Sequence, residues 1–188
     1  KNFNIINSKY SLQQLNQNIE TLKIEYLNLL LEKDGVFILE CNYWGGMVNN
    51  MNPIRIYLAD LTYNTVALST DANPLNIGYI AAYCKNRLGA DVDITLFKYI
   101  EELEEALYLS PPEILGLSNY CWCERVGLGM FQLAKHLNSK IITVWGGPNF
   151  PIDKASQSQY LLSKPEVDIY IPLEGEVPFA NAIERILD

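Results

Sequence analysis

Side chains that could do acid–base or nucleophilic chemistry are scarce in this chain of 188 residues, which contains a single histidine, His136. A Ser-His-Asp triad needs a histidine as its general base, and a histidine-rich zinc site needs several. His136 falls near the end of a stretch with helical periodicity, where an imidazole complements the partial negative charge of a helix C-terminus. We therefore predict that His136 is a solvated residue and neither a base nor a metal ligand.

The other candidates for metal or redox chemistry are two closely spaced cysteines, Cys121 and Cys123. Thiolates near a helix N-terminus are stabilised, so a C-x-C pair there could bind a metal or exchange electrons. No second pair completes a tetrahedral site, because the remaining cysteines, Cys41 and Cys84, are isolated in the sequence. We predict reduced thiols, no metal site and no catalytic residue in this chain.

Three short segments combine small residues with polar groups in a way that suits binding. They are Ser118-Asn119-Tyr120, Gly146-Gly147-Pro148 and Glu174-Gly175-Glu176. Glycine lets the backbone lie against a ligand, while hydroxyl, amide and carboxylate groups bind the ligand's polar atoms. The glutamates are explained equally well as acidic residues that complement a helix dipole. A phosphate-binding loop is not indicated, because no strand is followed by G-x-G-x-x-G or G-x-x-x-x-G-K-[ST].

The elements that must position these segments alternate between strand and helix from residue 54 onward. We expect strands at residues 54–60, 92–97, 113–118, 140–145 and 167–171, and helices at residues 73–88, 100–109, 122–137, 155–162 and 176–187. This alternation predicts an α/β, flavodoxin-like (Rossmann-like) fold: a five-stranded parallel sheet of order 2-1-3-4-5 with helices on both faces. In such a sheet all three segments lie at the carboxyl edge, where ligands bind.

The first 52 residues have a different character and are expected to form an N-terminal helical extension and linker, with the α/β domain at residues 53–188. A heptad-like apolar stripe predicts a helix over residues 11–33, and a short strand is expected at residues 36–39. The helix could form a homodimer or pack on its own domain. Packing on its own domain is favoured, because the stripe is short for a coiled coil.

Composition excludes two classes of partner. The formal net charge of −8 disfavours both nucleic acid and an anionic membrane surface, each of which attracts basic proteins. No basic start followed by a long apolar run is present, so neither a signal peptide nor a membrane span is predicted. We expect a cytoplasmic protein.

Two segments resemble parts of the cobalamin-binding domain found at the N-terminus of many radical SAM enzymes. Residues 73–83 are similar to that family's Pro-Leu-Gly-Leu helix start, with Asn76 in place of the usual glycine. Residues 114–120 are similar to the family's strand that ends in Gly-Leu-Ser or Gly-Ile-Ser.

The third part of the resemblance is a paired signature. Residues 144–148 carry the family's Gly-Gly-Pro, and residues 167–176 are similar to its Val-Asp segment followed by Gly-Glu-Gly-Glu, with Leu173 in place of the first glycine. The match covers residues 54–188 and implies a cobalamin lying across the strand ends. Ser118, Gly146 and Gly147 would line its nucleotide tail, and Tyr120 and Trp122 would cover one corrin face. The cofactor-binding residues that the resemblance implies are Thr62, Leu75, Ser118, Asn119, Tyr120, Gly146, Gly147, Pro148, Glu174, Gly175 and Glu176.

Two departures from related proteins limit what this chain would do. Cobalamin mutases carry Asp-x-His-x-x-Gly after the first strand, and the histidine ligates cobalt; here Thr62 stands where that histidine would be. We therefore expect no protein histidine on cobalt. The C-x-x-x-C-x-x-C that would hold an iron–sulfur cluster is absent, so S-adenosylmethionine and the cluster would belong to a C-terminal radical SAM domain, the partner of a non-catalytic cobalamin-binding domain.

The resemblance makes methyl transfer the expected reaction of the whole enzyme. Two alternatives remain open at this point: an α/β interaction module with a vestigial groove, and a flavin-binding flavodoxin-like domain. A threonine-containing loop after the first strand is compatible with flavin mononucleotide, although that loop lacks glycine.

Overall fold

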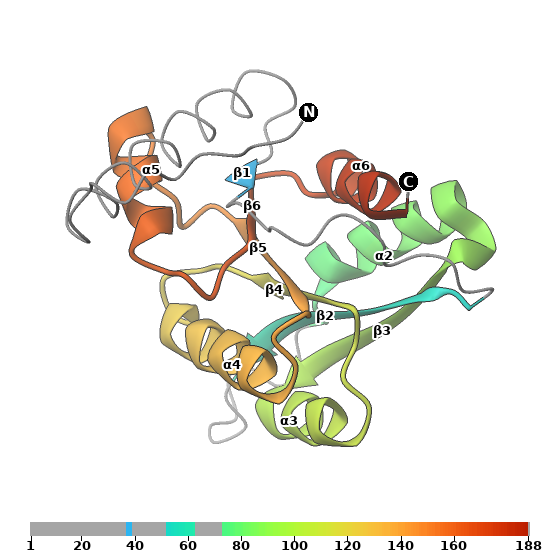
Figure 1. Ribbon diagram of the computed structural model, residues 1–188. Helices are drawn as coiled ribbons and strands as arrows, with labels where there is room; N and C mark the ends of the chain where they lie inside the picture. The colour runs from blue at the N-terminus through green and yellow to red at the C-terminus, as the bar shows by residue number, and fades with distance from the viewer. Residues whose placement is uncertain (1–36, 39–51, 63–72, 188) are drawn as a thin grey trace, which may run out of the picture.

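A computed structural model of the chain describes residues 37–38, 52–62 and 73–187 (Figure 1). Its strands are β1 (Phe37–Ile38), β2 (Ile54–Thr62), β3 (Val92–Tyr99), β4 (Ile114–Ser118), β5 (Ile142–Gly147) and β6 (Ile169–Pro172). Its helices are α2 (Leu75–Leu88), the short 3₁₀ helix η1 (Gly89–Asp91), α3 (Ile100–Leu109), α4 (Glu124–Leu137), α5 (Lys154–Leu162) and α6 (Glu176–Leu187). The expected helix over residues 11–33 lies outside the described residues.

The sheet has the order β1-β6-β5-β4-β2-β3. Strands β2 to β6 are all parallel, so the predicted five-stranded order 2-1-3-4-5 is confirmed. The expected short strand at residues 36–39 is present as β1, which pairs antiparallel with β6 and adds a sixth strand that the sequence did not place in the sheet. The order reverses at β2, which lies between β3 and β4.

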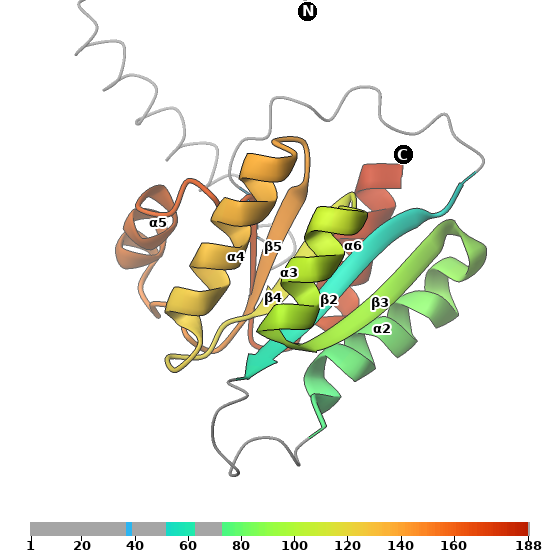
Figure 2. The same ribbon diagram turned by 90° about the horizontal axis from the view of Figure 1, so that it is seen from below.

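Helices cover both faces of the sheet, as predicted. Helices α2 and α6 lie on one face and α3 and α4 on the other, as the second view shows (Figure 2). Successive residues of a buried strand serve the two faces in turn: in β2, Ile56 and Leu58 pack with α2 and α6, whereas Tyr57 and Ala59 pack with α3 and α4. This alternation explains why the strands read as nearly continuous apolar runs.

The side chain of Trp145 in β5 is fully buried on the face covered by α3, α4 and α5. Helix α4 approaches it closely, because a Cβ on Gly127 would lie 3.3 Å from the indole nitrogen. The α4 helix begins at Glu124, two residues later than expected, since residues 121–123 form a turn after β4. Among the described residues, no helix is long and apolar enough to cross a membrane.

Candidate ligand-binding site

A pocket of about 150 Å³ lies between α2 and α6, beside the carboxyl ends of β4 and β5. Eight of the residues predicted to bind a cofactor line it: Ser118, Tyr120, Gly146, Gly147, Pro148, Glu174, Gly175 and Glu176. These residues come from the loops that follow three different strands, so the fold brings together segments that are far apart in the sequence. The pocket lies at the edge where parallel α/β sheets bind ligands.

Three of the predicted residues lie outside the lining. Thr62 is the last residue of β2 and pairs with Tyr99 of β3. Leu75 begins α2 and is 64% exposed, while its neighbour Asn76 lines the pocket instead. Asn119 is fully buried on the opposite side of the loop.

The floor of the pocket is apolar and includes a glycine. Leu58, Val144 and Phe179 contribute side chains to it, and Gly116 lies among them. A Cβ on Gly116 would stand 2.6 Å from Cδ2 of Leu58 and 3.5 Å from Cε2 of Phe179. Glycine at this position therefore allows Leu58 and Phe179 to pack against the β4 backbone at the floor of the pocket, a role that the sequence analysis did not assign to Gly116.

The two glycines after β5 have different roles. Gly147 has φ of +132°, and a Cβ there would lie 2.7 Å from the backbone oxygen of Asn119. A Cβ on Gly146 would lie 3.5 Å from its nearest neighbour, the backbone oxygen of Ile171, which is an ordinary contact. Only Gly147 therefore requires glycine for both its conformation and its packing.

The loop after β6 carries an unusual backbone conformation. Leu173 has φ of +61° and a side chain that is 75% exposed. A left-handed conformation is uncommon for a residue with a bulky side chain. The next glycine, Gly175, packs closely under α2, because a Cβ there would lie 2.9 Å from Cδ1 of Ile80.

A polar corner occupies the part of the pocket nearest β2. Nδ2 of Asn76 donates a hydrogen bond to Oγ of Ser118 over 2.9 Å and lies 3.5 Å from the hydroxyl oxygen of Tyr120. Asp60, near the end of β2, lies beside the side chains of Asn76 and Ser118. Burial raises the pKa of the Asp60 carboxyl above its ordinary value, and the hydrogen bonds from Asn76 and Ser118 oppose this shift. Neither Asp60 nor Asn76 was among the predicted binding residues.

Two aromatic rings stack beside this corner. The rings of Tyr120 and Trp122 lie 4.6 Å apart and are nearly parallel, with an interplanar angle of 4°. Trp122 is 67% exposed. The pair therefore presents a flat aromatic surface at the carboxyl edge.

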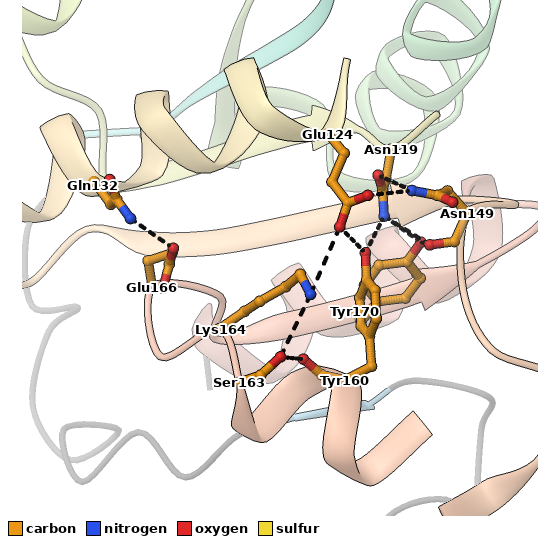
Figure 3. Close-up of polar contacts among 9 residues, drawn as sticks. All are labelled: Asn119, Glu124, Gln132, Asn149, Tyr160, Ser163, Lys164, Glu166 and Tyr170. Carbon is orange, nitrogen blue, oxygen red and sulfur yellow. Dashed lines mark hydrogen bonds and ion pairs between the residues drawn. The ribbon is translucent and has the colours of Figure 1, made fainter. Parts of the chain in front are cut away.

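Behind the loop lies a network of polar side chains that supports it from the other face of the sheet (Figure 3). Nδ2 of Asn119 lies 3.0 Å from the backbone oxygen of Asn149, 3.1 Å from the Tyr160 hydroxyl and 3.0 Å from the Tyr170 hydroxyl. The Tyr170 hydroxyl also donates to the backbone oxygen of Gly147 over 3.1 Å. The bond from Tyr170 holds the Gly147 backbone in place. Burial raises the pKa of the Tyr160 hydroxyl to about 12.

Glu124, the first residue of α4, closes the network. Its carboxylate accepts hydrogen bonds from Asn149 at 3.1 Å and Tyr160 at 3.2 Å, and Lys164 forms an ion pair with it at 3.6 Å (Figure 3). The Lys164 ammonium also lies 3.6 Å from the centroid of the Tyr160 ring. Helices α4 and α5 are thereby joined to the loop that borders the pocket.

The histidine and the two cysteines considered for metal or redox chemistry do not line the pocket. The part of the chain that the structure describes contains no cluster of three or more His, Cys, Asp or Glu residues able to hold a metal ion. His136 lies in the last turn of α4 and is exposed, as predicted. Cys121 is exposed, while Cys123 is buried and burial raises the pKa of its thiol. The geometry can bind and orient a ligand through a donor hydroxyl, backbone surface and aromatic faces.

The fold and the pocket define an α/β domain of flavodoxin-like topology with a pocket at the carboxyl edge of its sheet. No family model matches the chain. A curated relative, the 2-(S-pantetheinyl)-carbapenam-3-carboxylate methyltransferase of Streptantibioticus cattleyicolor, is 29% identical over 120 residues, an alignment that covers 61% of this chain and 17% of that enzyme. The chain thus corresponds to a small part of the relative's length.

Two solved structures are similar in fold. A cobalamin-binding protein from Desulfitobacterium hafniense DCB-2 matches with a TM-score of 0.51 and 11% identity, over 73% of this chain and 60% of that chain. The pilus assembly protein CpaE from Caulobacter crescentus CB15 matches with a TM-score of 0.48 and 15% identity, over 70% of this chain and 97% of that chain. At these identities the likeness concerns the fold.

Proposed function

We propose that this chain binds cobalamin at the carboxyl edge of its sheet, with the nucleotide tail in the pocket between α2 and α6. It would serve as the N-terminal domain of a radical SAM methyltransferase, whose S-adenosylmethionine and iron–sulfur cluster belong to the C-terminal domain. The observation that carries the proposal is the pocket itself. Ser118, Gly146 and Gly147, which the sequence resemblance assigns to the nucleotide tail, come together in its lining.

The residues present fit such a ligand on two structural observations. First, Gly146, Gly147 and Gly175 line the pocket, so a flat group can lie against the backbone at these positions without meeting a side chain. Second, the polar corner supplies a serine hydroxyl and an asparagine amide beside an apolar floor. An aromatic base with a few polar atoms requires this combination of shape and hydrogen bonding.

When bound, cobalamin supplies a cobalt centre that carries methyl groups. The contribution of this chain is to bind and orient. Ser118 meets the polar atoms of the tail, the Gly147 backbone packs against it, and Tyr120 and Trp122 offer an aromatic surface to the corrin. The side chain of Thr62 has no nitrogen that could ligate cobalt, so this position supplies no histidine ligand.

Both comparisons support the proposal. The curated relative is named as a methyltransferase, and one structure with the same fold is named as a cobalamin-binding protein. The relative is also much longer than this chain, in keeping with a binding domain that forms one part of an enzyme.

Mixing the purified chain with hydroxocobalamin and desalting it tests the proposal. We expect a protein-bound corrin absorption spectrum and a binding isotherm by titration calorimetry. Gly147→Val should weaken binding, because the side chain would enter the space beside Asn119. Loss of all corrin absorbance on desalting, together with a flat calorimetric trace, would overturn the proposal. Binding of flavin mononucleotide in place of cobalamin would favour a flavin-binding domain.

A further inference from the structure

We infer that Asn76 is a positioning residue that fixes the hydroxyl of Ser118 as a hydrogen-bond donor to the nucleotide base of the bound corrinoid. This inference rests on the proposed cobalamin-binding function and names a residue that the resemblance does not supply, because the related family has glycine at this position. Asn76 lies in the first turn of α2 and lines the same pocket as Ser118.

The first step is the direction of the hydrogen bond between the two side chains. Nδ2 of Asn76 lies 2.9 Å from Oγ of Ser118, with the nitrogen as donor. An amide nitrogen carries two hydrogens and can only donate hydrogen bonds, so the serine oxygen must be the acceptor in this bond. The single hydrogen of the serine hydroxyl then points elsewhere and remains available to donate.

The second step is the orientation of the amide, which depends on Asp60. Hydrogen bonding from the side chains of Asn76 and Ser118 acts to lower the pKa of the Asp60 carboxyl, so both groups face it. An ionised carboxylate only accepts hydrogen bonds, so the nitrogen of the amide faces it and the amide oxygen would be repelled. Asp60 therefore removes the usual ambiguity between the two ends of an asparagine side chain.

The third step concerns what the ligand offers. In the free protein the Ser118 hydroxyl faces the Asp60 carboxyl, whose pKa it acts to lower by hydrogen bonding. A benzimidazole base that is not coordinated to cobalt carries an unprotonated ring nitrogen, which is an acceptor. Such a base can take the serine hydrogen from Asp60, while the bond from Asn76 keeps the serine oxygen in place.

An unsatisfied atom supports a binding role for Asn76 over a purely structural one. Oδ1 of Asn76 is buried and has no hydrogen-bond partner. Buried polar atoms in proteins are nearly always paired, and an unpaired one lowers the stability of the fold. One end of the side chain is therefore unused in the free protein and is available to a ligand.

Titration calorimetry with two ligands tests the inference. Hydroxocobalamin carries the nucleotide tail, and dicyanocobinamide lacks it. We expect Asn76→Ala to raise the Kd for hydroxocobalamin about tenfold, the loss typical of one hydrogen bond, and to leave the Kd for dicyanocobinamide unchanged. Asn76→Gly, which restores the residue of the related family, should behave in the same way. A purely structural loss in Asn76→Ala would lower the melting temperature and would not distinguish the two ligands.

A double-mutant cycle supplies the control. Ser118→Ala should cause the same tail-specific loss, and adding Asn76→Ala to it should cause little further loss, because the asparagine acts through the serine. Equal losses for both ligands, or a loss in Asn76→Ala that adds fully to that in Ser118→Ala, would overturn the inference. An unchanged affinity for hydroxocobalamin in Asn76→Ala would overturn it while leaving the proposed function intact. If the wild type bound neither ligand, the proposed function itself would fail.

Discussion

A Cβ placed on Gly147 would lie 2.7 Å from the backbone oxygen of Asn119. The end of β5 and the segment after β4 thus approach each other closely through backbone at this point, beside the pocket that Gly147 lines. The positive φ of Gly147, +132°, is part of the same arrangement, because no other residue adopts it readily.

Gly147→Ala is therefore expected to lower the free energy of unfolding by about 2 kcal/mol and to weaken cobalamin binding. Urea denaturation and calorimetry measure the two effects. Gly146→Ala is the matched control, since its added Cβ would meet only the backbone oxygen of Ile171 at 3.5 Å, an ordinary contact. Similar losses in both variants would show that the contact with Asn119 is not the cause.

Leu173→Gly is expected to raise the free energy of unfolding by about 1 kcal/mol. Leu173 has φ of +61°, a conformation in which glycine is unstrained, and its exposed side chain contributes little burial. Thermal and urea denaturation measure the gain. Leu109→Gly, at an exposed helical leucine with no positive φ, should destabilise the fold instead. A loss of stability in Leu173→Gly would show that the leucine makes contacts which outweigh its strain.

Tyr170→Phe is expected to destabilise the domain by about 1–3 kcal/mol, because it leaves buried partners without a hydrogen bond. The lost hydroxyl accepts from Asn119 and donates to the backbone oxygen of Gly147. Tyr160→Phe provides the comparison: its hydroxyl contacts Asn119 and Glu124 but makes no bond to the Gly147 backbone. Cobalamin affinity should therefore fall in Tyr170→Phe more than in Tyr160→Phe, and the reverse order would contradict the proposed support of the loop.

Asp60 gives the domain a specific pH dependence. Burial raises its pKa above the ordinary value of 3.8, so the folded protein holds the proton more tightly than the unfolded chain does. As the pH rises from about this value through the raised pKa, the unfolded chain loses the proton first, and the stability of the fold decreases. Relative to the wild type, Asp60→Asn should therefore become more stable between pH 4 and pH 7, as measured by urea denaturation.

Asp153 supplies a control of opposite sign. Hydrogen bonds from Ser156 lower the pKa of the Asp153 carboxyl, which caps α5. Its contribution is present above the ordinary carboxyl range and is lost as the pH falls through the lowered pKa. Asp153→Asn should accordingly lose stability relative to the wild type toward neutral pH. A parallel response of the two variants would argue against the role assigned to burial at Asp60.

The order of the parallel strands was predictable because local patterns determine it. Runs such as residues 141–144 are apolar and β-branched, helical stripes separate them, and right-handed crossovers leave few arrangements. The pairing of β1 with β6 was not predictable, since a two-residue antiparallel contact has no pattern of its own.

The candidate site was predictable where it follows from strand ends, and less so where it depends on side-chain direction. Leu115 and Leu117 of β4 pack with α3 and α4, whereas Ser118 lines the pocket on the opposite face. If the alternation of strand faces continues past β4, Asn119 lies on the same face as the two leucines. Its hydrogen-bond partners, Tyr160 of α5 and Tyr170 of β6, agree with this placement. The period of two was therefore a signal that could have excluded Asn119 from the binding residues. For Asn76, the signal was a polar residue where relatives have glycine.

The short strand β1 has a further consequence for the behaviour of the domain in solution. Without it, β6 would be an edge strand whose free backbone groups could pair with another molecule. Phe37 and Ile38 occupy the positions opposite Tyr170 and Ile169, and Pro172 at the end of β6 has no amide hydrogen to offer. A chain shortened past Ile38 would expose this edge to intermolecular β-pairing, so the two-residue strand protects the domain against aggregation.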